Sequence, residues 1–318
     1  MSPITQKKRI TEKTYNIKPV AIIITIISVI LVTISLSMIP YVPVDIKSDF
    51  YMESHFKHLN TSKILIANLS SSVSSKNLIF IGDVHGSFDE LEMLLKKINY
   101  NSTNDHLIFV GDLVAKGPES LEVVKLVKKY ESSCVRGNHD DKVIGWKALL
   151  NLLARKGIKL KDYVKKNELP PHLSMGTEHL NLARNIDTEL FEFLSSCPIV
   201  LNIPEQDIYV VHAGLLPDIP IDQQDPYDIM TMRNIKNNGK PSKSLKKGHS
   251  WSRFWNNAQK SSPTPKTVIY GHDASRGLNI KEFSFGLDSR CVYGGELTAL
   301  KWNEGKSIHS VSCGKYTD

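Results

Sequence analysis

The sequence predicts a layered α/β fold preceded by one transmembrane helix. Two observations predict the fold: between residues 77 and 140, apolar runs of strand length alternate with helical patterns, and polar clusters follow the ends of these runs. A third observation, the uncharged apolar stretch 20–39, predicts the transmembrane helix. With 41% hydrophobic and 23% charged residues, the composition is that of a globular protein and excludes collagen, coiled coil and disorder throughout.

The N-terminal region is expected to form three segments before the globular domain. Residues 1–19 form a basic tail, 20–39 cross the membrane, and 40–76 form a stalk. The stalk contains one short apolar piece, Ile64–Leu69, and a segment that docks on the domain is an alternative for it. A helix of about 20 residues spans the bilayer hydrocarbon. A buried core helix would show a polar stripe, and a cleaved signal peptide would have a shorter apolar core. The globular domain then covers residues 77–318.

The charges that flank the apolar stretch predict its orientation. The cations that precede it are Lys7, Lys8, Arg9, Lys13 and Lys18. The downstream flank is mainly acidic, with Asp45, Lys47, Asp49 and Glu53. By the positive-inside rule the tail is cytosolic and the domain is lumenal or extracellular, a type II arrangement. Glycosylation motifs at Asn60, Asn68 and Asn101 suit that address, although about three matches are expected by chance.

Net charge and cysteine content exclude other classes of protein. The formal charge is +7, but more than half of it lies in the basic tail, so no nucleic-acid partner is expected for the domain. The four cysteines are too few for a disulfide scaffold and too scattered for a zinc ribbon. Any metal is therefore held by other ligands, and the sequence predicts neither cysteine pairing nor an oligomeric state.

The first part of the domain reads as repeated strand, loop and helix. The expected order is strand 77–81, helix 87–98, strand 106–110, a helix begun by Pro118 and strand 133–135. The first helix opens with Ser-Phe-Asp-Glu, a capping-box pattern, and proline suits the first turn of the second. Such alternation predicts parallel strands whose carboxyl ends share one edge of the sheet, where ligands bind.

The second part of the domain is less regular. Residues 141–198 read as mostly helical with a break at two prolines, and the apolar runs 207–211 and 267–270 each end in a loop that contains histidine. The stretch 283–302, rich in β-branched and aromatic residues around two adjacent glycines, predicts closing antiparallel strands.

A polar cluster follows each of five predicted strands. These clusters are Gly82–Gly86, Gly111–Val114, Gly137–Asp140, Val211–Gly214 and Gly271–Asp273. Taken singly, such an aspartate is more often a turn or cap residue, and such a histidine is more often a satisfied core or surface side chain. Five of them in equivalent positions predict a metal site.

The ligand types and their number indicate the metal. Carboxylate and amide oxygens mixed with imidazoles, without sulfur, suit zinc, manganese, iron or cobalt rather than calcium or an iron–sulfur cluster. Six ligands are too many for one catalytic metal with an open position. Two divalent ions about 3.5 to 4 Å apart that share a carboxylate explain the number and suggest displacement at phosphorus.

The motifs GDVHG, GDLV, GNHD, VHAG and GHD, in that order, resemble those of the calcineurin-like metallophosphoesterases over residues 78–301. This resemblance implies a layered β-sandwich flanked by helices. The segments RGNHD and VHAGLLP and the ending LDSRCVYGGELTAL are similar to the branch that contains symmetrical diadenosine tetraphosphatases and protein phosphatases. The single N-terminal span adds a resemblance to fungal vacuolar, zinc-dependent endopolyphosphatases, which implies zinc, with cobalt or manganese as alternatives, and a vacuolar membrane.

The resemblance also implies roles for individual residues. Two residues would hold the first metal, one would bridge, and three would hold the second; in that order they are Asp83 and His85, Asp112, and Asn138, His212 and His272. His139 matches the proton donor to the leaving oxygen, and Arg136 matches a phosphate-orienting arginine. Lys116 stands where many relatives carry arginine, and Arg233 is the expected second phosphate ligand.

Two positions depart from the family pattern. Ala115 replaces the carboxylate that orients the donor histidine in protein phosphatases, and Asp140 is the residue that could substitute for it. Arg290 stands where relatives often have glycine, and the sequence offers no physical reason for the arginine.

The leading hypothesis for function is a membrane-anchored hydrolase that cleaves internal phosphoanhydride bonds of polyphosphate. It depends on several cations around one dinuclear site, a lumenal address and the resemblance to fungal enzymes. The alternatives are a serine/threonine protein phosphatase, a diadenosine tetraphosphate hydrolase, and a non-catalytic binding module on a stalk. Loss of a metal ligand would favour the last, but all six are present.

Overall fold

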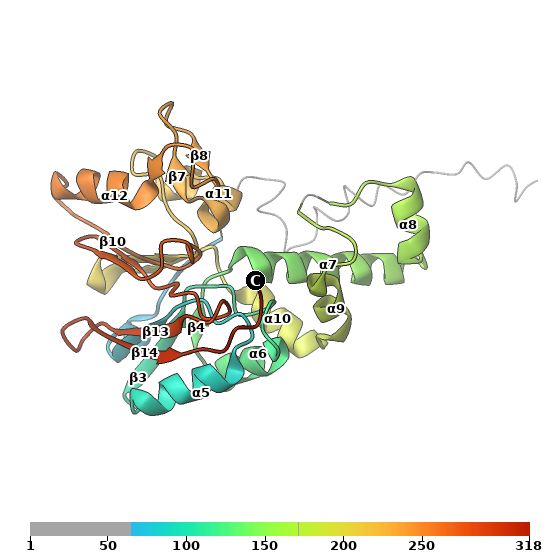
Figure 1. Ribbon diagram of the computed structural model, residues 1–318, viewed down its shortest axis with the longest axis horizontal. Coiled ribbons are helices and arrows are strands. Elements are labelled where there is room, and N and C mark those ends of the chain that lie inside the picture. Colours follow the sequence, from blue (N-terminus) through green and yellow to red (C-terminus); the bar gives the residue numbers. More distant parts are fainter. Residues whose placement is uncertain (1–64, 171) are drawn as a thin grey trace, which may run out of the picture. The chain divides into compact units, whose positions relative to one another are not determined.

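Two mixed β-sheets pack face to face at the centre of the computed structural model, which describes residues 65–170 and 172–318 (Figure 1). The predicted tail, the predicted transmembrane helix 20–39 and most of the predicted stalk lie outside the described residues. Within the part of the chain that is described, no helix combines the length and the apolar character needed to cross a membrane.

The first sheet has five strands, and three of them are the strands predicted from the first half of the domain. Its order is β14 (Ser307–Ser312), β13 (Glu296–Lys301), β2 (Asn77–Ile81), β3 (Asp105–Phe109) and β4 (Ser133–Cys134). β2, β3 and β4 are parallel, whereas β13 is antiparallel to both of its neighbours. The prediction of parallel strands is therefore confirmed. The stretch 283–302, predicted to form closing antiparallel strands, supplies β13 to this sheet, but Ser284–Gly286 belongs to the other sheet and is parallel to a neighbour there.

The second sheet has six strands. Its order is β1 (Ile66–Asn68), β5 (Val200–Ile203), β6 (Ile208–Val211), β10 (Thr267–Tyr270), β12 (Ser284–Gly286) and β11 (Asn279–Lys281). β6, β10 and β12 are parallel, and β5 and β6 form a hairpin around the short 3₁₀ helix Pro204–Gln206. The carboxyl ends of β6 and β10 lie beside those of β3 and β2 in the other sheet, because His212 contacts Val110 and the backbone of His272 contacts Asp83.

Part of the predicted stalk pairs with the domain. β1 lies within the predicted stalk, yet it pairs with β5 along its whole length, from Ile66 opposite Val200 to Asn68 opposite Asn202. The short helix α4 (Ser71–Ser74) then leads directly into β2. Three residues carry too little hydrophobic periodicity to indicate a strand, because their stability comes from a partner far along the chain.

β2 is buried on both of its faces, which explains its unbroken apolar sequence. Leu78 and Phe80 pack between the two sheets, while Ile79 and Ile81 face the helices outside the five-stranded sheet. The alternation follows from the two-residue period of a strand. A rigid strand of this kind fixes the position of the residues that follow it.

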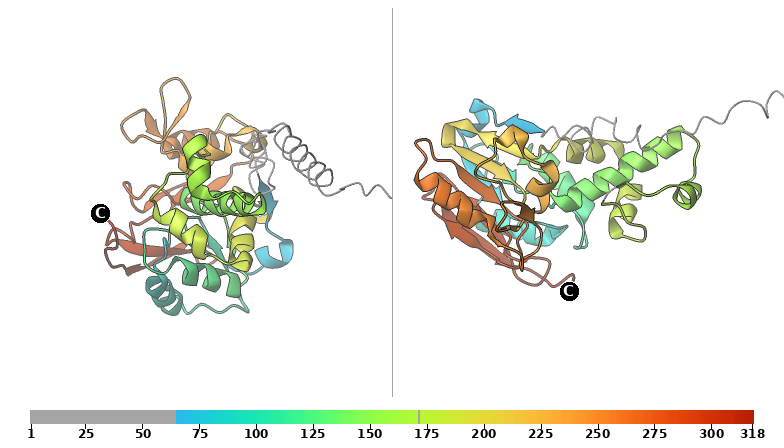
Figure 2. Two further views of the ribbon diagram at one scale, coloured as in Figure 1. Left: turned by 90° about the vertical axis from the view of Figure 1, so that its right-hand side faces the viewer. Right: turned by 90° about the horizontal axis from the view of Figure 1, so that it is seen from above.

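Helices cover the outer faces of both sheets. Those next to the five-stranded sheet are α5 (Phe88–Lys97), α6 (Ser120–Lys129), α7 (Asn138–Arg155), α8 (Leu160–Lys166), α9 (Glu178–Asn185) and α10 (Thr188–Ser196). Figure 2 shows α7 extending beyond the sheets. The other sheet carries α11 (Pro226–Thr231), α12 (Trp251–Lys260), the 3₁₀ helix Ile221–Gln223 and a small sheet of β8 (Pro241–Ser242), β7 (Asn234–Ile235) and β9 (His249–Ser250). The sequence analysis did not predict this last group.

Two disulfides join distant parts of the described domain. Cys134 at the end of β4 is bonded to Cys197 after α10, and Cys291 is bonded to Cys313. All four cysteines of the chain are thus paired. Both bonds lie close in sequence to residues of the site described next.

Candidate metal centre

Five of the six predicted metal ligands converge in two overlapping groups of three. The ligand atoms of Asp83, His85 and Asp112 lie within 4.8 Å of one another, and so do those of Asp112, His212 and His272. All five residues are buried. Asp112 belongs to both groups, which is the position predicted for a bridging ligand. The sixth ligand, Asn138, points its Oδ1 at His212 Nε2 (3.3 Å).

Each of the three histidines is held through one ring nitrogen. The hydrogen-bond network assigns Nδ1–H of His85 to the carbonyl of Val114 (3.2 Å) and Nδ1–H of His212 to that of Val110 (2.9 Å). His272 donates through Nε2 to Thr231 (3.1 Å). The second nitrogen of each ring faces the cluster, where its lone pair would serve a metal ion.

Asp140 organises the loop that carries Asp112. Its carboxylate accepts hydrogen bonds from the backbone N–H groups of Asp112 (2.8 Å), Leu113 (2.9 Å), Val114 (3.3 Å) and Gly137 (3.0 Å). These bonds use both oxygens and leave neither directed at His139. Asp140 is therefore not the substitute for the carboxylate missing at Ala115, because it is committed to the backbone.

A second histidine, which the sequence analysis missed, orients His139. His139 Nδ1 lies 2.9 Å from His179 Nε2 on α9, and the backbone N–H of His139 donates to Asp112 Oδ1 (2.8 Å). A carboxylate oxygen of Glu178 lies within 4.8 Å of both imidazoles. No local pattern marks His179, since the 40 residues that separate it from His139 are brought together only by the packing of α9 on α7.

The backbone of the site is strained in several places. Six of the eleven described non-glycine residues with positive φ line the same cavity; they are His85, Asp112, Lys116, His172, His272 and Arg290. Such a conformation costs about 1 kcal/mol or more and persists where the surrounding structure imposes it. Arg290, with φ of 70°, explains why glycine suits that position in relatives.

Two glycines allow the backbone to approach the carboxylates. A Cβ at Gly137 would lie 2.2 Å from Asp112 Oδ1, and one at Gly271 would lie 1.9 Å from Asp83 Oδ1. Both distances are far shorter than a van der Waals contact. Glycine immediately before Asn138 and His272 is therefore a steric requirement of the cluster.

Burial and mutual repulsion of carboxylates dominate the electrostatics. Burial, reinforced by Asp288, raises the pKa of Asp83 well above its usual value. Burial also opposes ionisation of Asp112, but the neighbouring His212, His139 and His85 outweigh it and hold its pKa well below the usual value. Burial lowers the pKa of His85 to about 4. Burial opposes protonation of His212, but the adjacent Asp112 outweighs it and raises the pKa of His212 to about 9. Crowded buried carboxylates beside imidazoles form a donor set that fits divalent cations.

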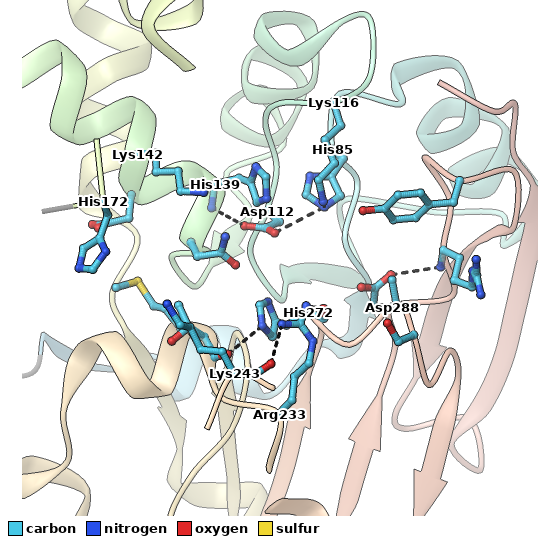
Figure 3. A pocket seen from close by; sticks show the side chains of 18 of the residues that line it. His85, Asp112, Lys116, His139, Lys142, His172, Arg233, Lys243, His272 and Asp288 are labelled. Carbon is cyan, nitrogen blue, oxygen red and sulfur yellow. Dashed lines mark hydrogen bonds and ion pairs between the residues drawn. The ribbon is translucent and has the colours of Figure 1, made fainter. Parts of the chain in front are cut away.

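The cluster opens into a cavity of about 550 Å³ that is lined by five cations (Figure 3). We call these five residues the cationic rim: Lys116, Lys142, Arg233, Lys243 and Arg290. Lys116 Nζ lies 2.9 Å from His85 Nε2, so a cationic group already occupies the lone pair directed at the cluster. Arg233 donates to the carbonyl of His272 (3.3 Å). Lys116 and Arg233 were predicted from the sequence as site residues, whereas Lys142 and Lys243 were not.

The position of Arg136 does not fit the predicted contact with phosphate. Its side chain is 1% exposed and does not line the cavity. Its guanidinium donates to the carbonyl of Ser195 (2.6 Å) and to Asp141 Oδ1 (3.3 Å), which ties β4 to α10 and α7. The motif places Arg136 next to the ligands in sequence, but the side chain points into the protein.

Comparisons with known proteins agree with this geometry. The sequence profile of the calcineurin-like phosphoesterases matches residues 76–314. The zinc-dependent endopolyphosphatase of Saccharomyces cerevisiae is 30% identical over 257 residues, which cover 71% of this chain and 76% of the yeast protein. The symmetrical bis(5'-nucleosyl)-tetraphosphatase of Vibrio parahaemolyticus is 29% identical over 275 residues, covering 70% of this chain and 94% of that protein.

A solved structure of a candidate diadenosine tetraphosphatase resembles the domain with a TM-score of 0.64 and 34% sequence identity, and the match covers 79% of this chain and 99% of that one. The β-sandwich, the order of the five motifs and the profile match therefore agree, and the predicted resemblance is confirmed. This protein belongs to the calcineurin-like phosphoesterase family and is a metal-dependent phosphohydrolase.

Proposed function

We propose that this enzyme cleaves internal phosphoanhydride bonds of inorganic polyphosphate with two divalent metal ions, zinc in the first place and cobalt or manganese as alternatives. One observation carries the proposal: five cations line the cavity above a cluster in which two groups of ligands share Asp112. A substrate with a negative charge on every repeating unit can contact all five cations at once. The 30% identity with the yeast zinc-dependent endopolyphosphatase supports the same substrate.

The proposed metal ligands divide between the two groups. Asp83, His85 and Asp112 would hold one ion, and Asp112 with Asn138, His212 and His272 would hold the other. Divalent ions supply charge stabilisation at phosphorus and lower the pKa of bound water toward neutrality. The residues around the ions bind the substrate, orient it and move protons.

His139 is the proposed proton donor to the leaving phosphate. Burial lowers the pKa of its imidazole, so the donor form depends on nearby negative charge, which an anionic phosphate in the cavity provides. His179 fixes the orientation and tautomer of the ring through its 2.9 Å contact with Nδ1, so that Nε2 is the nitrogen available to the substrate. This pair takes the place of the histidine and carboxylate of protein phosphatases.

Arg233 and Lys116 are the proposed ligands of the phosphates nearest the scissile bond. Both line the cavity, and both contact a residue of the metal cluster, through the carbonyl of His272 and the imidazole of His85 respectively. Cations on two sides of the metals can bind phosphates on both sides of the bond that breaks. That arrangement favours internal cleavage.

Diadenosine tetraphosphate is the main alternative substrate. It also contains a phosphate chain, and the relative from Vibrio parahaemolyticus hydrolyses a compound of that class by its name. A stacked pair of rings at the cavity, His172 and Tyr227, is the feature that favours it, because a nucleobase could stack there. A protein phosphatase is less well supported, since Ala115 replaces the family carboxylate.

The test compares substrates and metals on one preparation of the full-length protein. Long-chain polyphosphate, diadenosine tetraphosphate and a phosphopeptide are incubated with zinc, cobalt, manganese or magnesium. We expect the highest kcat/KM with polyphosphate, and with zinc or cobalt. Higher kcat/KM with diadenosine tetraphosphate or the phosphopeptide would promote that alternative, and no hydrolysis of any substrate would favour the non-catalytic binding module.

We also propose that the enzyme is a type II protein of the vacuolar membrane with a lumenal catalytic domain. Four cysteines in two disulfides suit an oxidising compartment, and Asn101 of one glycosylation motif is exposed. The basic tail and the apolar stretch 20–39 support the orientation. Protease added to intact vesicles should spare the domain, and digestion without detergent would contradict the orientation.

A further inference from the structure

The cavity continues beyond the metal cluster toward the start of α7. Figure 3 shows Lys142 and His172 on one side of Asp112, with Lys116 and Asp288 on the other. Lys142 follows Asn138 by four residues on α7, so both side chains lie on the same face of the helix. Lys243, which follows β8, and Tyr227 of α11 complete this side of the cavity.

Neither lysine on this side has a carboxylate partner among the residues that the structure describes. Lys142 is half-buried, yet it forms no hydrogen bond or ion pair with any residue in the described part of the chain. Among those same residues, the ammonium group of Lys243 donates only to the hydroxyl of Tyr227, at 2.5 Å. Asp141 lines the cavity nearby, but its Oδ1 accepts from Arg136. On this side of the cavity, two ammonium groups are therefore not paired with any carboxylate that the structure describes.

The charges around Lys142 favour an anion at this side of the cavity. Burial lowers the pKa of the Lys142 ammonium, and Lys116 and Lys243 lower it further, while Asp112 and Asp141 oppose them. Like charges that are partly withdrawn from water repel one another, and an anion bound between them removes the repulsion.

Lys243 is held in place rather than left free in solvent. The ring of His172 stacks on Tyr227 with centroids 4.0 Å apart and planes 15° from parallel. Lys243 Nζ lies 4.9 Å from the centre of the same tyrosine ring while it bonds to the hydroxyl. Tyr227 thus holds the ammonium group of Lys243 at the wall of the cavity, and His172 stacks on the same tyrosine ring.

We propose that Lys142 and Lys243 form a second phosphate-binding subsite, which binds phosphates of a polyphosphate chain beyond those held at the metal centre. The inference rests on the proposed function, since only a chain longer than the metal centre can reach it. Figure 3 shows Asp112 of the metal cluster between Lys142 on one side and Lys116 on the other, while Arg233 lies beside Lys243. The enzyme would therefore hold a chain at both ends of the cavity and cut between them.

The test measures kcat and KM of the full-length, metal-loaded protein and its variants Lys142→Met and Lys243→Met. The substrates are long-chain polyphosphate, diadenosine tetraphosphate and p-nitrophenyl phosphate, whose single phosphate occupies the metal centre alone. Lys165→Met is the matched control, because it removes an exposed lysine of α8 that does not line the cavity. Lys142→Arg restores the charge and shows whether a defect comes from charge or from folding.

We expect the kcat/KM for polyphosphate, relative to that for p-nitrophenyl phosphate, to fall about tenfold in Lys142→Met and about threefold in the more exposed Lys243→Met. This decrease should come from a higher KM for polyphosphate, with kcat nearly unchanged. The slope of log KM against log salt should become shallower by about 0.7 to 0.9 for each lysine removed, as for other polyanions. Lys142→Arg should retain most of the wild-type ratio, and Lys165→Met all of it.

Unchanged ratios in both methionine variants would overturn the subsite while leaving polyphosphate cleavage by the wild-type enzyme, and thus the proposed function, intact. A defect limited to diadenosine tetraphosphate, shared by His172→Ala, would overturn it in favour of a nucleotide site. A wild-type enzyme that leaves polyphosphate uncut would remove the proposed function, and the subsite with it.

Discussion

The metal cluster and the cationic rim share one cavity but are built in different ways. The cluster follows the carboxyl ends of β2, β3, β4, β6 and β10, and five of its six residues are buried. The rim comes from α7 and from loops, and its Lys243 and Arg290 are exposed. Rigid strand ends hold the proposed metal ligands in place, whereas less constrained segments carry the residues that would determine substrate specificity.

The largest effect should follow loss of the residue that both ligand groups share. Asp112→Asn removes one charge from each group, so we expect kcat to fall by at least about 10⁴-fold and the bound metal to decrease. Metal content measured by mass spectrometry, together with kcat, checks this. Asp222→Asn, an exposed aspartate of a 3₁₀ helix, is the control. Full metal content with normal turnover in Asp112→Asn would contradict the bridging role.

The proton donor and its partner should give a smaller, graded loss. We expect His139→Ala to lower kcat by about 10² to 10⁴-fold and His179→Ala by about 10 to 100-fold, both with normal metal content. The loss should be greater for phosphate leaving groups than for p-nitrophenolate, which needs little protonation. His179→Gln, which can still bond to Nδ1, should recover part of kcat. A wild-type leaving-group dependence in His179→Ala would refute its positioning role.

The disulfides offer a comparison of stability, since one lies beside each region. Cys134–Cys197 closes 63 residues next to the cluster, and Cys291–Cys313 closes 22 next to Arg290 of the rim. By loop entropy, replacing each pair with serine should lower the free energy of unfolding by about 4 and about 3 kcal/mol respectively. Urea denaturation measures both values. A larger loss from the shorter loop would mean that local packing outweighs loop entropy.

The smallest effect is expected at the edge of the rim. Arg290→Gly relieves a positive φ but gives the unfolded chain more freedom, so the free energy of unfolding should change by less than about 1 kcal/mol. KM for polyphosphate should rise about threefold, because an exposed cation contributes little. Arg290→Ala, which keeps the strain, should be less stable than Arg290→Gly. Equal stabilities would show that the positive φ carries no cost.

The difference between the two regions also explains how much the sequence could predict. The ligands Asp83, Asp112 and His212 follow apolar strands at once, so a local pattern reveals both the element and the residue. The parallel strands followed from the same periodicity, but the pattern of residues 283–302 did not reveal that β12 and β13 belong to different sheets. The edge strand β1 and the small sheet around β7 were not predicted, because each of these strands has only two or three residues.

Contacts that depend on tertiary packing escaped prediction. His179 reaches His139 only through the packing of α9 on α7, and Lys142 reads in sequence as one charged residue among many on a helix. Arg136 shows the converse. It belongs to a recognisable motif, but its side chain points toward Ser195 rather than the cavity, and a motif does not specify side-chain direction.

The central claim is that the cluster cuts a phosphate chain which the rim holds on both sides. Its most direct test follows the chain length of long polyphosphate on a gel over time, together with release of orthophosphate, using the full-length enzyme with zinc. We predict that intermediate lengths accumulate before much orthophosphate appears. Release of single phosphates from the first turnovers, while the remaining chains shorten only from their ends, would contradict the claim.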